Sequence, residues 1–310
     1  MFSLTCTYLC AFMYYVVFGV FYLLSLLPMA VLYLFSDFAY VVVYYLLGYR
    51  KKVVMQNLTI AFPDKTEEER IKIAKAFYKN FCDTFIETIK YISVRRSFFD
   101  KRFIVDFSQL EKIYATGQSI QFQLGHNFNW ELANLAIPGH LKYKLLGVYL
   151  PIGTGIFNRL FKYIRSRFGT QLIAATNMRS EMMPHRNTKF VIGLIADQAP
   201  PVPEKAYWIN FFNRPTPFLK GPEKAAKSNN YAVVFIYFDK IKRGYYTCQA
   251  ITVSLSPAQL PDGELTTIYA ANLQKIMTEH PEMWLWSHRR WKHEWKPEYG
   301  PVLNAKTNKE

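Results

Sequence analysis

Apolar and polar residues alternate in a short stretch near the middle of the chain. Residues 120–124 have a period of two, which predicts a β-strand, and Gly125 ends the pattern. His126 follows, and either Asn127 or Asn129 can cap the apolar helix that comes next. The pattern therefore predicts a strand-to-helix turn with His126 at the carboxyl end of the strand. Sheets of α/β proteins place their ligands at that edge.

Similar patterns predict the other elements of one large domain. Strands are predicted at 144–150, 171–175, 190–196, 231–239 and 245–253, and helices at 157–168, at 266–280 and from Gly221-Pro222-Glu223 onward. The strand at 190–196 is almost entirely apolar, as buried parallel strands are. Thr66 and Glu69 form a capping box before an amphipathic helix that runs to Ile89. We expect an α/β fold in which helices flank a mixed, mostly parallel sheet.

Prolines and aromatic residues crowd one segment, 199–218. This composition predicts an ordered loop that crosses an apolar site or a membrane surface rather than a flexible linker.

The first 36 residues carry no charged side chain. Residues 8–27 are apolar and long enough to span a membrane, and 29–49 predict a second helix that lies in the interface or extends the span. A cleaved signal peptide is the alternative, but the chain has no basic segment before the apolar one and no small-residue cleavage site. The sequence thus predicts a membrane anchor at 1–49 and a catalytic-size domain at 50–310. The basic cluster Arg50-Lys51-Lys52 favours a domain on the cytoplasmic side.

The chain of 310 residues has a formal charge of +15, which indicates an anionic partner such as a phospholipid surface, an acidic protein or a nucleic acid. Phe and Tyr are abundant, as in proteins that work on lipids. No nucleic-acid-binding motif accompanies the charge. The 4 cysteines form no disulfide framework.

His126 and Glu131 lie five positions apart across the predicted turn. A glutamate in the first helical turn is favoured in its ionised form, and it can fold back onto the imidazole to fix its tautomer. Such a histidine can act as the general base for a substrate hydroxyl. The simpler alternative is a helix-cap histidine and an ordinary first-turn acid.

Other polar residues have two interpretations each. Arg165 and Arg167 can bind phosphate or stabilise an oxyanion, or they can form a solvated basic helix face. Asp197, at the same sheet edge as His126, can pair with such an arginine or simply end its strand. The spacing of His288 and His293 does not favour a metal site.

Tryptophans alternate with basic residues in segment 281–292, which includes Arg289 and Arg290. That alternation suits contact with phosphate headgroups at a membrane interface.

Taken together, these motifs resemble those of the late acyltransferases of lipid A biosynthesis, the lauroyl/myristoyl transferase family. The resemblance rests on Arg50-Lys51-Lys52…Asn57-Leu58, Phe62-Pro63, His126…Asn129-Trp130-Glu131, Arg165-Ser166-Arg167-Phe168-Gly169, Ala196-Asp197-Gln198, Phe211-Phe212-Asn213-Arg214-Pro215 and the 281–292 segment. Phe128 departs from the family pattern, which has glycine at that position.

The resemblance implies a glycerol-phosphate-acyltransferase-like fold and transfer of a fatty acyl group from an acyl carrier protein, or from coenzyme A, to a lipid hydroxyl. His126 would be the base, Glu131 its orienting partner, and Arg167 with Asp197 a catalytic or structural pair. Asn129 and Arg165 would support the site. No metal or other cofactor is implied, and the expected location is the inner membrane.

Two alternatives stay open at this stage. The same chemistry can serve another acceptor, such as an aminolipid, a glycolipid or a polyene pigment. The chain can also be a membrane-anchored basic binding protein without catalysis.

Overall fold

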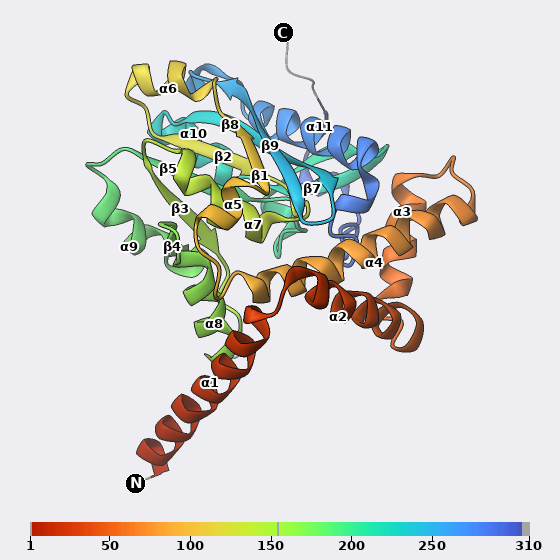
Figure 1. Cartoon of the computed structure of the whole chain (residues 1–310). Helices are drawn as coiled ribbons and strands as arrows, with labels where there is room; N and C mark the ends of the chain where they lie inside the picture. The colour runs from red at the N-terminus through yellow and green to blue at the C-terminus, as the bar shows by residue number, and fades with distance from the viewer. Residues whose placement is uncertain (1, 154, 306–310) are drawn as a thin grey trace.

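A computed structural model describes residues 2–153 and 155–305, with side chains from residue 12 onward. One sheet organises the fold, and helices pack around it (Figure 1). Its strand order is β1-β9-β8-β2-β5-β3-β4, with bounds β1 Phe103–Asp106, β2 Ile120–Leu124, β3 Lys144–Tyr149, β4 Gln171–Ala174, β5 Phe190–Ile195, β8 Ala232–Lys242 and β9 Tyr245–Ser254. The β8–β9 pair is antiparallel and the other pairings are parallel. The predicted fold class is confirmed.

Helices α1 to α5 precede the first strand, and the later helices lie between strands in the sequence. They are α1 Phe2–Leu26, α2 Met29–Val41, α3 Lys51–Ala61, α4 Glu67–Lys90, α5 Ser97–Asp100, α6 Leu110–Thr116, α7 Trp130–Ala136, α8 Gly155–Ser166, α9 Met178–Met182, α10 Gly221–Asn229 and α11 Glu264–Glu279. A π-helix, Val42–Leu46, continues α2. The helices predicted at 157–168 and 266–280 correspond to α8 and α11, and α10 begins at Gly221.

Helix α4 begins as its sequence predicts, because Thr66 and Glu69 form the capping box. Its burial differs from the prediction of a single apolar face. Phe85 is 51% exposed, whereas the polar side chains of Asp83 and Glu87 are buried. The reason is that α2 covers a second side of α4, which turns positions that would face solvent into interior positions.

The segment 199–218 is not a loop. It contains β6 (Ala206–Phe211) and β7 (Arg214–Leu219), an antiparallel hairpin in a second sheet with order β10-β6-β7, where β10 is Val302–Asn304. The turn residues Phe212 and Asn213 both have positive φ, the conformation of the tight turns that match strand twist. The prolines of β7 are tolerated because that strand lies at the sheet edge.

The N-terminal helices lie at one side of the domain, with α1 extending away from it and α2 lying beside α4 (Figure 1). Among the described residues, Met29–Leu46 is long and apolar enough to cross a membrane by length and composition, and Phe12–Leu26 is apolar but shorter. The predicted span at 8–27 includes residues 8–11, whose side chains lie outside the described part of the chain.

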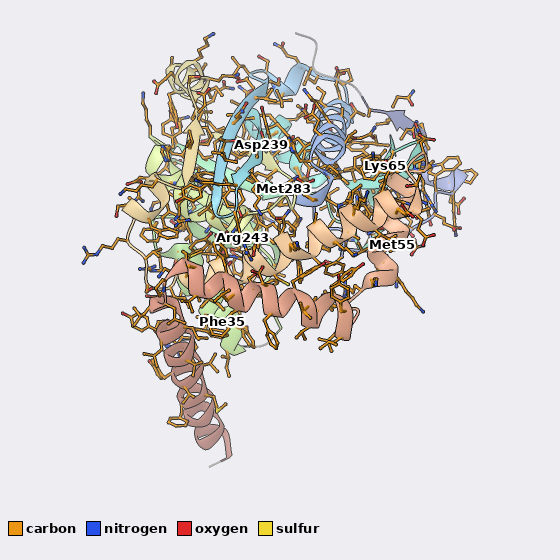
Figure 2. The ribbon with its side chains drawn as sticks, turned by 45° about the vertical axis from the view of Figure 1, so that its right-hand side comes forward. Phe35, Met55, Lys65, Asp239, Arg243 and Met283 are labelled. Atoms are coloured by element: carbon orange, nitrogen blue, oxygen red, sulfur yellow. The ribbon has the colours of Figure 1, made fainter. Side chains whose placement is uncertain are left out.

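Helix α2 has two contrasting sides. Phe35 and Phe38 are 48% and 69% exposed and belong to an apolar outer surface. On the inner side, the guanidinium of Arg243 donates from Nη2 to Asp37 Oδ1 at 2.7 Å and to Asp83 Oδ1 at 2.6 Å. Figure 2 shows Phe35 and Arg243 on opposite sides of this helix. A polar network therefore attaches α2 to the domain and leaves its apolar side uncovered.

Candidate active site

His126 lies two residues after the carboxyl end of the central strand β2. Every residue of that strand is buried. Gly125 precedes it because the space there is full: an added Cβ would lie 2.6 Å from Asn127 Oδ1 and from Leu273 Cδ1. The chain then turns into α7, where Asn129 Oδ1 accepts a hydrogen bond from the Leu132 backbone N–H at 3.0 Å. The predicted cap is confirmed, and it fixes the turn that carries His126.

Asp197 is the carboxylate that holds the imidazole of His126. Oδ1 of Asp197 lies 2.5 Å from His126 Nδ1, and Oδ2 accepts the His126 backbone N–H at 2.7 Å. Strand β5, which leads to Asp197, pairs in parallel with β2, so both strands end at the same edge of the sheet. The indole Nε1 of Trp284 also donates to Asp197 Oδ2, at 2.7 Å. The carboxylate is therefore fixed by donors on both oxygens.

The environment keeps Asp197 ionised although its side chain is fully buried. Burial works against the charge, but the attraction of His126 and the hydrogen bonds from His126 and Trp284 outweigh it and lower the pKa of Asp197 to about 2. An ionised carboxylate on Nδ1 favours a proton at that nitrogen. Nε2 is then the basic nitrogen of the ring.

The His126 side chain is partly exposed, and its Nε2 faces the side chain of Gln198. The His126 side chain is 19% exposed, and the amide Nε2 of Gln198 approaches the imidazole Nε2 at 3.4 Å. The indole ring of Trp130 stands edge-on to the imidazole, with ring centroids 5.4 Å apart. This arrangement can accept a proton from a hydroxyl placed against His126 and stabilise the resulting imidazolium through Asp197.

Glu131 has a different partner from the one expected. Its Oε2 accepts from Arg165 Nε at 2.9 Å, its Oε1 pairs with Arg165 Nη2, and the Trp130 indole donates to it. Burial acts against the charge of Arg165, yet the pKa of Arg165 is raised because Glu131 lies beside it. The pair joins α7 to α8. The carboxylate that contacts His126 comes from the neighbouring strand rather than from the following helix.

Arg165 and Arg167 do not present free guanidinium groups to a ligand. Arg165 is occupied by Glu131, and Arg167 donates to the backbone carbonyls of Tyr91 and Val94, the latter at 3.1 Å. The expected pairing of Arg167 with Asp197 is not observed, since the partners described for Asp197 are His126 and Trp284. Arg167 instead fixes the chain that follows α4.

The segment 281–292 packs against the turn that carries His126, and much of it is buried. Leu285 N–H donates to the His126 carbonyl at 3.1 Å, and Phe128 N–H donates to the Met283 carbonyl at 2.8 Å. The side chains of Trp284 and Trp286 are buried because this segment crosses the interior beside the turn. The alternation of tryptophan with basic residues predicted an exposed interface, and that prediction is wrong for most of the segment.

The basic residues predicted to contact headgroups separate into two groups. The side chains of Arg50, Lys51, Lys52 and Arg289 lie on the exposed surface, whereas Arg290 is 0% exposed. Arg290 Nη2 donates to the Pro217 carbonyl at 2.9 Å, and its guanidinium lies 4.3 Å from the ring centroid of Phe218. A lipid headgroup cannot reach it in this fold.

His288 has a structural contact next to the site. Its Nε2 accepts the backbone N–H of Ala199 at 3.0 Å, and burial lowers the pKa of His288 to about 4. A neutral ring at neutral pH suits this acceptor role. His288 thereby holds the segment that carries Asp197 and Gln198. Apart from its position in segment 281–292, no sequence pattern indicates this role of His288.

The depressed pKa of Asp197 predicts an acid-sensitive fold. The pKa falls from an ordinary 3.8 to about 2 on folding, so the ionised group stabilises the folded state above its unfolded pKa, and the stability is lost as the pH falls through its folded pKa. We expect a contribution of about 2 kcal/mol that disappears between roughly pH 4 and pH 2. Thermal unfolding in detergent at successive pH values measures it. Asp197→Asn should remove this part of the pH dependence, and an unchanged acid profile in that variant would contradict the assignment.

Comparison with known proteins gives one assignment. The family model for bacterial lipid A biosynthesis acyltransferases matches residues 1–293. No curated protein matches the chain.

Proposed function

The chain belongs to the bacterial lipid A biosynthesis acyltransferase family, and from this we propose that it transfers a fatty acyl group from an acyl thioester to a hydroxyl of a lipid A precursor. His126 is the general base in this proposal, and Asp197 is the carboxylate that orients it. The observation that carries these roles is the hydrogen bond between His126 Nδ1 and Asp197 Oδ1, which leaves Nε2 as the basic nitrogen of a partly exposed ring.

In this proposal the reaction has two steps. Nε2 of His126 takes the proton of the acceptor hydroxyl as its oxygen attacks the thioester carbonyl carbon. The tetrahedral intermediate expels the thiolate, which receives the proton from the imidazolium. Asp197 stabilises that imidazolium, and the side-chain amide of Gln198 provides a donor close to the reacting atoms. A thioester has a good leaving group, so positioning and base catalysis are sufficient.

The acyl donor in this proposal is a thioester of an acyl carrier protein. The chain carries a formal charge of +15, and an acidic carrier would be attracted to it. Coenzyme A is the alternative donor, and direct comparison of the two thioesters with purified enzyme distinguishes them.

We propose that the enzyme binds the cytoplasmic face of the inner membrane through α1 and the outer side of α2. Exposed apolar residues continue along both helices, among them Val20, Leu23, Leu34, Phe35 and Phe38. The exposed Lys51 and Lys52 follow directly and suit anionic headgroups. Because the inner side of α2 is bonded to the domain through Asp37 and Arg243, this helix lies along the membrane surface rather than across it.

The double substitution Phe35→Asp with Phe38→Asp should weaken binding to anionic phospholipid vesicles by at least about 100-fold, because each phenylalanine that leaves the lipid loses about 1.5–3 kcal/mol. Vesicle flotation measures this. Ile104→Asp is the matched control, since Ile104 is 59% exposed on strand β1. Equal binding of the double variant and the control would show that the outer side of α2 does not contact the membrane.

Mass spectrometry of lipid A tests the function. A host that lacks its own late acyltransferase should gain one acyl chain on lipid A when it expresses the wild-type chain, and no chain with His126→Ala. An unchanged lipid A profile with folded, membrane-bound protein would reject the acceptor, and total-lipid profiling would then identify another one. Addition of the chain by His126→Ala would reject the base.

A further inference from the structure

A buried carboxylate outside the reaction chemistry lies behind the catalytic turn. Glu87 of α4 is 1% exposed and accepts hydrogen bonds from groups on several elements. Tyr33 donates to its Oε1 at 2.8 Å, and Oε2 accepts from Asn129 Nδ2 at 2.7 Å and from the hydroxyls of Tyr91 and Tyr246 at 3.3 and 3.2 Å. Burial raises the pKa of Glu87, but these four donors match the ionised form of the carboxylate.

Asn129 transmits the position of Glu87 to the catalytic turn. One hydrogen of its Nδ2 goes to Glu87 and the other to the hydroxyl of Tyr91, at 3.2 Å. Its Oδ1 caps α7 through the backbone N–H of Leu132. The side chain is 1% exposed, and both its amide nitrogen and its carbonyl oxygen are used. Asn129 therefore cannot touch a substrate, but it sets where the turn between His126 and α7 lies.

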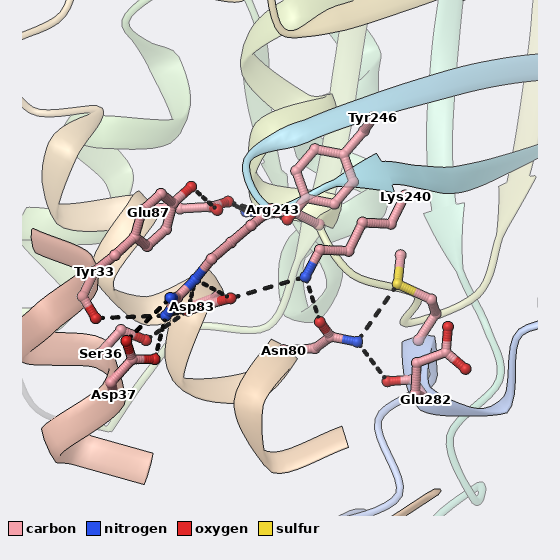
Figure 3. A network of polar contacts seen from close by, with 12 residues as sticks. Tyr33, Ser36, Asp37, Asn80, Asp83, Glu87, Lys240, Arg243, Tyr246 and Glu282 are labelled. Atoms are coloured by element: carbon pink, nitrogen blue, oxygen red, sulfur yellow. Dashed lines mark hydrogen bonds and ion pairs between the residues drawn. The ribbon is translucent and has the colours of Figure 1, made fainter. Parts of the chain in front are cut away.

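The other end of this connection is α2. Tyr33, which bonds to Glu87, lies on that helix, and the same side of α2 is held by Asp37 through Arg243. Figure 3 shows Tyr33, Glu87 and Tyr246 together at the junction of α2, α4 and the β8–β9 hairpin, beside the ion pairs of Asp83. A continuous series of hydrogen bonds thus runs from the helix with the apolar outer side to the turn that carries the base.

We propose that Glu87 is a positioning residue for acyl transfer, which holds the His126 turn in its active geometry through Asn129 and makes that geometry depend on the docking of α2 through Tyr33. The inference rests on the proposed function of the His126 site. It predicts that disturbing the contact between Glu87 and Asn129 lowers kcat while leaving KM nearly unchanged, because neither residue contacts a substrate.

An exchange of donor and acceptor tests the hydrogen bond between Asn129 and Glu87. Asn129→Asp preserves the cap of α7, since aspartate is an equally good cap, but it sets a second carboxylate against Glu87. We expect kcat to fall by about 100-fold, as misplacement of reacting groups by about 1 Å can do. Adding Glu87→Gln supplies an amide donor for the introduced carboxylate and should restore kcat to within about tenfold of the wild type. The kinetic assay uses an acyl thioester and a purified lipid A precursor.

One tyrosine variant and one serine variant test the link to α2. Tyr33→Phe removes the donor to Glu87, whereas Ser36→Ala removes a hydroxyl that bonds to Asp83 at 2.7 Å from the same helix. We expect a loss of kcat of about three- to tenfold for Tyr33→Phe, the size of one net hydrogen bond, and a smaller loss for Ser36→Ala. Hydrogen exchange of the peptide that covers 126–136 should accelerate in Tyr33→Phe and in Asn129→Asp. It should return to the wild-type rate in the double variant Asn129→Asp with Glu87→Gln.

The outcomes separate this inference from the proposed function. If the wild type shows no acyl transfer, the function is rejected, and the exchange rates of 126–136 still decide the connection. If the wild type is active and His126→Ala is not, the inference is overturned by an Asn129→Asp variant that Glu87→Gln fails to rescue, or by equal exchange rates in Tyr33→Phe and the wild type. A rise in KM with constant kcat in Asn129→Asp would also overturn the inference, because that result assigns Asn129 to substrate binding.

Discussion

Asp197→Asn is expected to lower kcat for acyl transfer by about 10²–10⁴-fold, the usual size of general-base assistance. Oδ2 of Asp197 accepts from two donors, the His126 backbone and the Trp284 indole. The carbonyl oxygen of an asparagine must therefore occupy that position, and its amide group must face His126 Nδ1. An amide that donates to Nδ1 moves the ring proton to Nε2. A protonated Nε2 cannot accept the proton of the substrate hydroxyl. Steady-state kinetics at neutral pH measures the loss.

Glu131→Gln is the matched control for this experiment, because it makes the same chemical change in the carboxylate that sequence spacing alone assigns to His126. Glu131 contacts Arg165 and Trp130 in the structure, so we expect a loss of activity below about tenfold in a folded Glu131→Gln protein. An active Asp197→Asn variant together with an inactive Glu131→Gln variant would reverse the assignment and make Glu131 the orienting group.

The position of His126 at the end of a strand was predictable from sequence, and the identity of the carboxylate that contacts it was not. His126 follows a strand whose alternation is visible, and Asn129 caps the next helix as expected. Both features depend on residues that are close in sequence. The contact with Asp197 spans 71 positions and depends on the parallel pairing of β2 with β5. A spacing rule favours the nearest carboxylate, and that carboxylate is bound by an arginine of α8.

Burial explains the other differences between the predicted and observed site. Arg290 and the tryptophans beside it have the composition of an interfacial segment, yet this segment crosses the interior and clamps the turn. Composition reports what a side chain can contact, while tertiary packing decides what it does contact. The β6–β7 hairpin was missed for a related reason, since its prolines argue against a central strand but are compatible with an edge strand. Six strands of the main sheet were predicted from their apolar patterns, whereas β1, a four-residue strand at the sheet edge, was not.

The second large effect concerns stability and arises from the Glu131–Arg165 pair. Their side chains are 6% and 22% exposed, and two hydrogen bonds join them between α7 and α8. Glu131→Leu leaves the guanidinium of Arg165 inside the protein without its carboxylate, and we expect a loss of about 3–5 kcal/mol in the free energy of unfolding. Adding Arg165→Met removes the unpaired charge and should recover most of that loss. Chemical denaturation in detergent measures both values.

A surface pair provides the control for this cycle. Lys142 and Glu111 are 59% and 63% exposed, and Lys142→Met should change the free energy of unfolding by less than about 1 kcal/mol. A small effect of Glu131→Leu, similar to that of Lys142→Met, would mean that water reaches the guanidinium of Arg165 and that the pair does not hold α7 against α8. A large effect with recovery in the double variant means that α8 holds the first turn of α7 through Glu131, beside the cap that Asn129 forms. In that case two contacts hold the start of the helix that follows the His126 turn, and Glu131 positions that helix rather than the imidazole, which Asp197 contacts.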